Sequence, residues 1–366
     1  MSRIFVFGAT GYTGDLTARS LITRGMRPIL VGRNQQRLDA LARELGKVTG
    51  TGALDTATAD ATDPASIRQL LEPGDVLIST VGPFLKFGRP AVQAAAEVGT
   101  HYLDSTGEGP FIREVFEKWG PIAKRNGSAL LTAFGYDFVP GALAGALALE
   151  SAGNQATGLD IAYFSPGFTP SGGSQASVVR VALDESFSFS EGRIQPQRPG
   201  KHTKRFDIDG TTNLGASVPA AEHFGLPQTY PQLREINVLL GFPQSAARFL
   251  AFGSRLVGPL GKIGVVNRGI TSLADRAAKG STGGPDATER AKATTVVFAD
   301  ARSGDRQLTR IELRGPNPYE VTGDLLAWGA MQIDAGGLKD TGALGPISAF
   351  GLDAIQDACR EAGMSW

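Results

Sequence analysis

A glycine-rich turn, Gly8-Ala9-Thr10-Gly11-Tyr12-Thr13-Gly14, follows a short apolar run at Arg3–Phe7 and opens a stretch with helical periodicity. Backbone N–H groups and the helix dipole at such a start bind a pyrophosphate, and glycine lets the backbone approach it closely. Because the turn stands in the strand–turn–helix context that dinucleotide binding requires, we prefer that interpretation over a purely structural turn. The residues that we expect to hold the cofactor here are Gly8, Thr10, Gly11, Tyr12, Thr13 and Gly14.

The second expected strand ends in Val31-Gly32-Arg33-Asn34, where an NAD site normally has an Asp or Glu for the ribose hydroxyls. This chain instead has Arg33, with Arg37 one helical turn later. Guanidinium groups suit a 2′-phosphate, so the pair favours NADP(H) over NAD; the alternative is that both arginines are simply solvated. Asp60 and Ala61, after the third expected strand, fit the edge of the adenine pocket.

Ligands of doubly wound sheets bind outside the carboxyl ends of the strands, so the loops after the fourth, fifth and sixth expected strands should converge near the nicotinamide. These loops are Thr80–Phe84, Asp104–Glu108 and Gly135–Pro140. His101 begins the fifth strand at the opposite edge, and we therefore expect a structural role for it. In the first loop the expected cofactor contacts are Thr80, Val81, Gly82, Pro83 and Phe84.

Four side chains remain as candidate acids near the reacting end: Tyr136, Asp137, Glu108 and Lys86, the last mainly as a substrate contact. None of the tyrosines has a lysine four residues later, which speaks against a short-chain dehydrogenase. The chain has neither an HExxH motif nor paired CxxC motifs, so we expect no catalytic metal. For each candidate a structural or binding role is the alternative, and Asp137 could instead cap a helix starting near Val139-Pro140.

The elements that position these residues alternate between apolar runs and helical stretches over residues 1–150. That pattern predicts a Rossmann-type α/β fold with a doubly wound parallel sheet. Asp63-Pro64, a capping residue and a proline at the first helical position, predicts one of the helix starts. The expected strands are Arg3–Phe7, Pro28–Val31, Thr56–Ala61, Val76–Thr80, Tyr102–Asp104 and Ala129–Ala133.

Beyond residue 150 the pattern changes to that of a second, α+β domain over about 151–317. Residues 318–366 are expected to be mainly helical, at Glu320–Ile333 and Pro346–Ala362, and to pack back against the first domain. Ser303-Gly304-Asp305 predicts the turn of an antiparallel hairpin. The expected strands of this domain are Leu159–Phe164, Thr294–Asp300 and Gln307–Leu313.

Composition narrows the class of protein. At roughly 150 residues per domain, 366 residues suggest about two domains. The 36 basic and 36 acidic side chains cancel, which argues against a nucleic-acid-binding protein. The single cysteine, Cys359, excludes an intramolecular disulfide and indicates a reducing cytoplasm. The apolar run at the N-terminus is too short for a signal peptide, so we expect none.

No apolar run is long enough to span a bilayer. Val238–Val266 comes closest, but Arg248, Arg255 and Lys262 interrupt it, and we expect a helix on the core or at a subunit interface. The alternative is a surface that meets a lipid-like substrate or a membrane face.

Six basic residues gather in a short part of the second domain. We expect a solvated loop; the alternative is a clamp for a phosphate-bearing carrier arm or an acidic carrier protein. The residues of this basic cluster are Arg193, Arg198, Lys201, His202, Lys204 and Arg205.

Together the motifs resemble the saccharopine dehydrogenase-like oxidoreductases, most closely their branch of trans-acting enoyl reductases. The resemblance implies an NADP-binding Rossmann domain, a central domain with substrate and subunit contacts in a homodimer, and a C-terminal helix that rejoins the first domain. It also implies hydride transfer to an unsaturated acyl chain held as a thioester or on a carrier. The segments that carry it are Gly8–Gly14, Val31-Gly32-Arg33, Gly82-Pro83-Phe84, Tyr102-Leu103-Asp104 with Gly107-Glu108, Gly135-Tyr136-Asp137 with Pro140, Ser171–Ser174, and Gly342–Pro346 with Gly351.

Two positions depart from the pattern of that branch: Tyr136 stands where we expect Phe, and Ser174 where we expect Thr. Both are therefore candidate substrate contacts, and the Tyr136 hydroxyl could mean a different substrate or a direct proton donor. We expect an NADPH-dependent reductase that transfers hydride to an activated C=C bond of an acyl or small-molecule biosynthetic intermediate. The alternatives are a reductase of C=N bonds (an imine reductase) and a non-catalytic NADP-binding sensor or scaffold.

Overall fold

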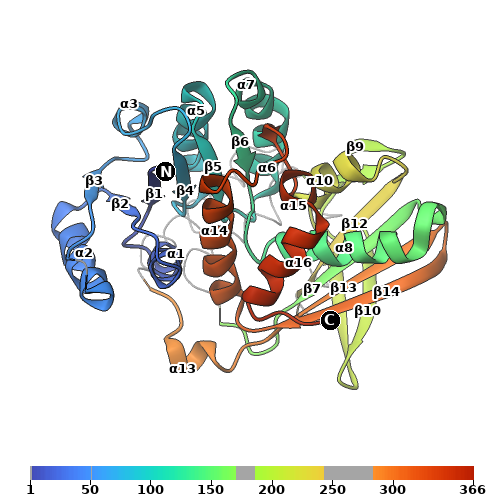
Figure 1. Ribbon diagram of the computed structural model, residues 1–366. Coiled ribbons are helices and arrows are strands. Elements are labelled where there is room, and N and C mark those ends of the chain that lie inside the picture. Colours follow the sequence, from blue (N-terminus) through green and yellow to red (C-terminus); the bar gives the residue numbers. More distant parts are fainter. Residues whose placement is uncertain (1, 51, 170–185, 243–282) are drawn as a thin grey trace, which may run out of the picture. The chain divides into compact units, whose positions relative to one another are not determined.

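The computed structural model describes residues 2–50, 52–169, 186–242 and 283–366 (Figure 1). The chain forms two compact units. The first unit consists of Met1–Thr106, Phe111–Val139 and Tyr319–Gly363. The second unit consists of Gly107–Pro110, Pro140–Pro318 and Met364–Trp366.

The first unit is built on a seven-stranded parallel sheet with the order β15-β6-β5-β4-β1-β2-β3. This order confirms the doubly wound fold, with β1 and β4 side by side at the point where the strand order reverses. The six predicted strands are present, and a seventh comes from the C-terminal segment. The strands are β1 (Ile4–Phe7), β2 (Ile29–Gly32), β3 (Thr56–Thr58), β4 (Val76–Ser79), β5 (His101–Asp104), β6 (Ala129–Leu131) and β15 (Gly342–Ala343).

Helices connect these strands and cover the sheet. Asp63 caps α3 through the Ala65 N–H, as Asp63-Pro64 predicts. The helical segment after β5 is interrupted by a π-helical turn, η1 (Val115–Trp119). The remaining helices before residue 139 are α1 (Tyr12–Thr23), α2 (Gln35–Thr49), α3 (Pro64–Arg68), α4 (Phe84–Phe87), α5 (Arg89–Val98), α6 (Gly109–Glu114) and α7 (Gly120–Arg125).

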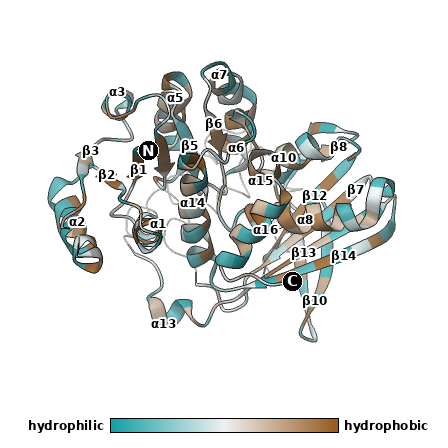
Figure 2. Cartoon of the chain, viewed as in Figure 1, coloured by the Kyte–Doolittle hydropathy of each residue, from teal (hydrophilic) through white to brown (hydrophobic). Residues whose placement is uncertain are grey.

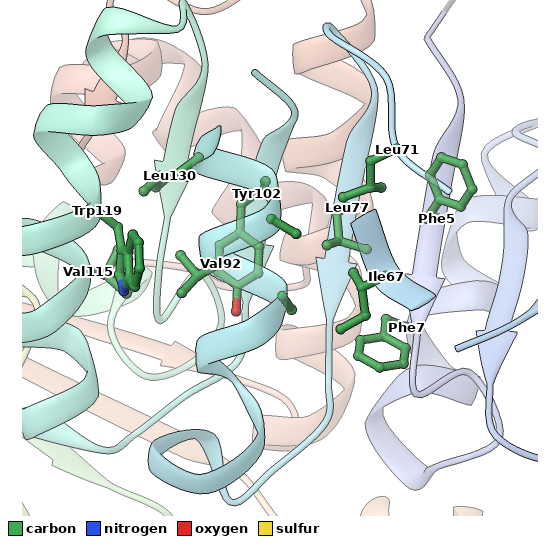
Figure 3. Packing of buried hydrophobic residues seen from close by; sticks show 14 of the residues in the cluster. Phe5, Phe7, Ile67, Leu71, Leu77, Val92, Tyr102, Val115, Trp119 and Leu130 are labelled. Carbon is green, nitrogen blue, oxygen red and sulfur yellow. The ribbon is translucent and has the colours of Figure 1, made fainter. Parts of the chain in front are cut away.

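The strands β1, β4 and β6 of the parallel sheet are short apolar runs because both of their faces are buried. Successive side chains of a strand point to opposite faces, so Phe5, Phe7 and Leu77 lie on one face. There they form one core cluster with Ile67 of α3 and Val92 of α5 (Figure 3). The hydropathy colouring shows β1 and β6 as strongly apolar (Figure 2).

The C-terminal segment returns to the first unit, as the sequence predicts. The helix α14 (Pro318–Asp334) lies against α1, where Ser20 Oγ donates to Asp324 Oδ1 at 2.5 Å. The predicted helix over Pro346–Ala362 is two helices, α15 (Pro346–Phe350) and α16 (Leu352–Glu361). Gly351, with φ of 91°, separates them because this left-handed conformation does not continue a helix.

The second unit contains a sheet of eight strands in which β10-β11-β12-β7-β13-β14 form the main path and β8 joins β12 to β9. The three predicted strands and the hairpin at Ser303-Gly304-Asp305 are present, whereas β8, β9, β10, β11 and β12 were not predicted. The helices are α8 (Val139–Ala152), the 3-10 turn η2 (Gly153–Gln155), α10 (Glu222–Thr229) and α13 (Ala287–Arg290). The strands are β7 (Gly158–Phe164), β8 (Phe187–Ser190), β9 (Arg193–Pro196), β10 (Thr203–Ile208), β11 (Thr211–Ser217), β12 (Glu235–Phe242), β13 (Thr295–Ser303) and β14 (Arg306–Gly315).

Two predictions for this unit were wrong. The apolar stretch that we expected to be a helix from Val238 begins instead in β12, where Ile236 and Val238 alternate with Asn237 on a strand. The rest of that stretch, 243–266, lies outside the described residues. The basic cluster is not one solvated loop, because Arg193 begins β9 and Lys204 lies within β10.

Lys204 is also not available to a partner molecule. Its Nζ donates to Asp160 Oδ2 at 2.8 Å and to Asp300 Oδ2 at 2.9 Å. Asp160 and Asp300 are paired across β7 and β13, so their carboxylates lie close together and Lys204 bridges them. No helix in the described part of the chain is both long and apolar enough to cross a membrane.

Candidate functional site

The turn between β1 and α1 is so tight that two of its positions require glycine. Gly8 has φ of 90°, and its N–H donates to Val31 O at 2.9 Å. A Cβ at Gly8 would lie 2.7 Å from Thr80 Oγ1, and one at Gly14 would overlap the carbonyl oxygen of Gly8. The structure thus leaves room only for backbone where the sequence predicts a pyrophosphate.

The start of α1 is open to a phosphate group. Gly11 occupies the N-cap position in an extended conformation and has no side chain with which to cap the helix. Gly11 is exposed, and its N–H donates a hydrogen bond to Gly8 O at 2.8 Å. The orphan N–H groups of a first helical turn and the positive end of the helix dipole are the groups that hold an anion. Thr10, Tyr12 and Thr13 are all partly exposed around this start.

The two predicted arginines lie on the β2 side of the sheet, where the adenosine half of a dinucleotide would bind. Arg33 directly follows β2 and is exposed. Arg37 is exposed on the first turn of α2, and one of its terminal nitrogens donates to Thr10 O at 3.3 Å. Asn34 caps α2 by accepting from the Arg37 N–H, which fixes the backbone between the two arginines. Two guanidinium groups next to the phosphate turn fit a 2′-phosphate.

Asp60 and Ala61 follow β3 at the same edge of the sheet. The Asp60 carboxylate accepts from both the N–H and the hydroxyl of Thr62, at 2.8 and 2.7 Å. These hydrogen bonds, and the charge of Arg33, hold the pKa of Asp60 below its usual value. Asp60 therefore stays ionised at the end of a loop that its own hydrogen bonds fix, whereas Ala61 is buried.

The first of the three loops expected near the nicotinamide follows β4. Thr80 Oγ1 donates to Phe7 O at 3.1 Å and so ties this loop to the end of β1. Val81, Gly82 and Pro83 are at least partly exposed, as cofactor contacts must be. Phe84 is buried and packs against the ring of Phe111, with centroids 5.7 Å apart.

Lys86 was predicted as a substrate contact. It is exposed on α4, with its Nζ 5.0 Å from the centre of the Phe87 ring. Of the predicted acids, Glu108 is buried and belongs to the second unit, whereas Tyr136 and Asp137 belong to the first. Ser174, the remaining predicted substrate contact, lies outside the described residues.

Tyr136 and Asp137 lie on the loop between β6 and α8, at the carboxyl end of the sheet. Tyr136 is buried, and its N–H donates to Thr322 Oγ1 at 3.0 Å. Asp137 is partly exposed and has no hydrogen-bond or ion-pair partner among the described residues. Burial raises the pKa of its carboxyl to about 6. Although α8 starts two residues later, the expected capping by Asp137 is not seen in this part of the chain.

Asp104 is a residue of this site that the sequence analysis mentioned only as part of a motif. It ends β5, is fully buried, and accepts from the N–H groups of Thr106 and Ala133, both at 2.9 Å, and from the Thr132 hydroxyl at 2.8 Å. Burial raises the pKa of Asp104 to about 6, against the opposing effect of these hydrogen bonds. A carboxylate at the end of an otherwise apolar strand was the signal that could have identified it.

His101 confirms the argument from strand direction. It stands at the amino end of β5, where its Nδ1 accepts from the Ala129 N–H at 3.1 Å. Burial lowers the pKa of His101, so it is a neutral side chain with a structural partner.

Comparison with known proteins agrees with these features. Residues 4–130 match the family model for the saccharopine dehydrogenase NADP binding domain. The chain is 29% identical over 412 residues to a candidate trans-acting enoyl reductase of Mycobacterium tuberculosis, with 99% of this chain and 96% of that protein covered. A trans-acting enoyl reductase of Mycobacterium ulcerans is 37% identical over 139 residues, which span 37% of this chain and 33% of that one.

The fold has a counterpart among solved structures. Apo saccharopine dehydrogenase (L-Glu forming) from Saccharomyces cerevisiae superposes with a TM-score of 0.58 at 13% identity, covering 99% of this chain and 97% of that one. The fold and the site therefore define an oxidoreductase that uses NADP(H) on a Rossmann-type domain. Within that class the chain is saccharopine dehydrogenase-like, with relatives that are named as trans-acting enoyl reductases.

Proposed function

We propose that the enzyme reduces the C=C bond of an enoyl thioester, with Asp137 as the group that supplies the proton. The observation that carries this proposal is the Asp137 carboxyl, which is without a described partner and has a pKa raised to about 6, on the loop after β6. That loop lies on the β4-β5-β6 side of the sheet, opposite the side that carries Arg33 and Arg37. A dinucleotide bound across the strand-order reversal has its nicotinamide on this side.

When bound, NADPH supplies a hydride, which forms a C–H bond at the β-carbon while the C=C electron pair moves toward the thioester carbonyl. The chain must then deliver a proton to the α-carbon. A carboxyl whose pKa lies near 6 is partly protonated at neutral pH and can act as that acid. Tyr136, its neighbour in the chain, is the second candidate donor because its hydroxyl belongs to the same loop. The names of the mycobacterial relatives support an acyl substrate.

The test is a comparison of substrates at saturating NADPH. Loss of the reduced nicotinamide absorbance is followed with short and long enoyl thioesters and, as a rival class, with cyclic imines. Turnover of enoyl thioesters supports the proposal, and turnover of imines alone excludes it. Tight NADPH binding without turnover of either class would favour the sensor alternative.

The pH dependence tests the role of Asp137. An acid must be protonated to act, so kcat/KM should be highest below pH 6 and fall about tenfold per pH unit as the pH rises well above it. In Asp137→Asn this fall of kcat/KM with rising pH should disappear together with most of the activity. Tyr136→Phe is the matched control: it should keep both the activity and this pH dependence if Asp137 is the donor. If the Tyr136 hydroxyl is the donor, Tyr136→Phe should lose most of the activity and Asp137→Asn should keep it.

Three coarser features belong to the same proposal. We place cofactor binding in residues 1–150, substrate and homodimer contacts in 151–317, and a C-terminal part that completes the first unit in 318–366. An acyl carrier protein could present the substrate, with Arg193, Lys201 and Arg205 as the exposed cations of the basic cluster. The single cysteine supports a reducing cytoplasm as the compartment.

A further inference from the structure

The first turns of α14 reach two parts of the site that are far apart in the sequence. The ring of Tyr319 packs edge to face on the ring of Tyr12 in the phosphate turn, with centroids 4.9 Å apart and planes at 88°. One turn later, Thr322 Oγ1 accepts the N–H of Tyr136 on the loop after β6. These residues all belong to the first unit. The sequence of α14 contains no motif from which either contact could be predicted.

The approach of Thr322 to this loop is close. A Cβ added to Gly135 would lie 2.7 Å from Thr322 Cγ2 and 3.0 Å from its Oγ1, so the loop touches α14 only because residue 135 is glycine. At its other end the same loop is held by Asp104, which accepts the N–H of Ala133. Ala133 has φ of 57°, a conformation that an alanine adopts only when its surroundings enforce it. The segment from Ala133 to Asp137 is thus anchored from β5 on one side and from α14 on the other.

We propose that Thr322 is a positioning residue, whose hydroxyl sets the place of Tyr136 and Asp137 by holding the Tyr136 peptide. This inference rests on the proposed function, in which that loop carries the proton donor. A misplaced catalytic group loses rate even when the cofactor still binds, because a shift of about 1 Å can cost on the order of a hundredfold.

The attachment of α14 to the first unit does not depend on the Thr322 hydroxyl. Gly323 packs so closely on Leu16 of α1 that a Cβ added to it would lie 3.3 Å from Leu16. One turn after Leu16 on α1, Ser20 donates a hydrogen bond to Asp324 of α14. Ser20→Ala therefore removes a hydrogen bond between α14 and α1 without touching the loop. It is a matched control for loosening of the helix alone.

The experiment compares Thr322→Val, which keeps the shape and removes the acceptor, with Thr322→Ser, which keeps the hydroxyl. Thr322→Val should lower kcat for the enoyl thioester by about tenfold or more, with the Kd of NADPH within about twofold of the parent. Thr322→Ser should stay within about threefold in kcat. Ser20→Ala should lower Tm and leave kcat within about twofold. A Thr322→Val variant with reduced Tm and unchanged kcat would overturn the inference.

Amide hydrogen exchange separates this inference from the proposed function. In the NADPH complex, the Tyr136 N–H should exchange at least about tenfold faster in Thr322→Val than in the parent and in Thr322→Ser. If the parent turns over no enoyl thioester but this pattern appears, the substrate class is wrong and the role of Thr322 in holding the loop stands. Unchanged exchange at Tyr136 in Thr322→Val refutes that role, whatever the activity.

Discussion

Replacing Asp104 with Asn should stabilise the protein at alkaline pH. The substitution keeps the shape of the side chain and its hydrogen bonds: both backbone N–H groups donate to the same oxygen, Oδ1, and the Thr132 hydroxyl faces the other, Oδ2. In Asn, Oδ1 can accept both N–H groups, and the side-chain NH₂ can donate to the Thr132 oxygen. What changes is the charge, which is fully buried in the native protein.

The magnitude follows from the pKa of Asp104, which rises from 3.8 in the unfolded chain to about 6 in the fold. A raised acid pKa means that ionisation destabilises the native state, so stability is lost as the pH rises from below 4 to above 6. At 1.36 kcal/mol per pKa unit, the loss at pH 8 is about 3 kcal/mol. Asp104→Asn should therefore gain up to ~3 kcal/mol at pH 8 and little near pH 4.

Urea unfolding at pH 4, 6 and 8 measures this difference. Tryptophan emission is a suitable probe, because Trp119 and Trp328 are buried in the first unit, at 4% and 3% exposure. Asp104→Ala is the control: it also lacks the charge but leaves buried donors without an acceptor, so it should be less stable than Asp104→Asn by at least about 3 kcal/mol at every pH. If Asp104→Asn is less stable than the parent at pH 8, the carboxylate charge contributes favourably and the argument from desolvation is refuted.

Two further predictions concern the cofactor and the second unit. Arg33→Asp should weaken NADPH binding by about 100-fold and change NADH binding only a fewfold, because the new carboxylate repels the 2′-phosphate. Fluorescence titration with both cofactors measures the two dissociation constants. Equal weakening of NADPH and NADH binding would contradict the assignment of Arg33. Gly141→Ala should lower the free energy of unfolding by about 3 kcal/mol, since its Cβ would overlap the Tyr163 hydroxyl, which donates to buried Glu222 at 2.6 Å. Thermal unfolding should show a smaller loss for Gly145→Ala, whose Cβ would meet only the flexible ends of Leu159, Leu226 and Ile161, the nearest at 2.9 Å.

The parallel sheet could be predicted because its signals are local. Each of β1, β4 and β6 is an apolar run followed by a turn, and burial on both faces leaves no polar alternation to confuse the pattern. β15 could not be predicted, since it is two residues long and pairs only with β6. Its pairing depends on a tertiary contact across more than 200 residues of sequence.

The second sheet was harder to predict because one of its faces carries charged side chains inside the fold. Asp160, Lys204 and Asp300 stand at positions where a buried strand normally has apolar residues. The two carboxylates are tolerated because Lys204, Arg302 and Arg310 pair with them. Read along the sequence, Lys204 and its basic neighbours indicated a solvated loop. The pairing of β7 with β13 sets Asp160 beside Asp300, and Lys204 of β10 donates to both carboxylates.

The candidate site divides in the same way between local and distant signals. The phosphate turn and Arg33 could be predicted because the residues that identify them are consecutive in the sequence. Thr322 could not, because it acts on Tyr136 from 186 positions away. Asp104 belongs to the motif Tyr102-Leu103-Asp104. Its role in holding the loop after β6 could not be predicted, because only the pairing of β5 with β6 brings the Ala133 N–H within reach of its carboxylate.

Asp104 and Asp137 show why a raised pKa alone does not identify a catalytic acid. Burial raises the pKa of both carboxyls to about 6. Asp104 accepts three hydrogen bonds from its own loops, so its oxygens are occupied and its charge state bears on stability. Asp137 has no such partners in the described part of the chain, so its proton can be given to a ligand. Asp104→Asn should thus change stability with pH and Asp137→Asn the pH profile of turnover, and an exchange of these two effects would show that the roles are reversed.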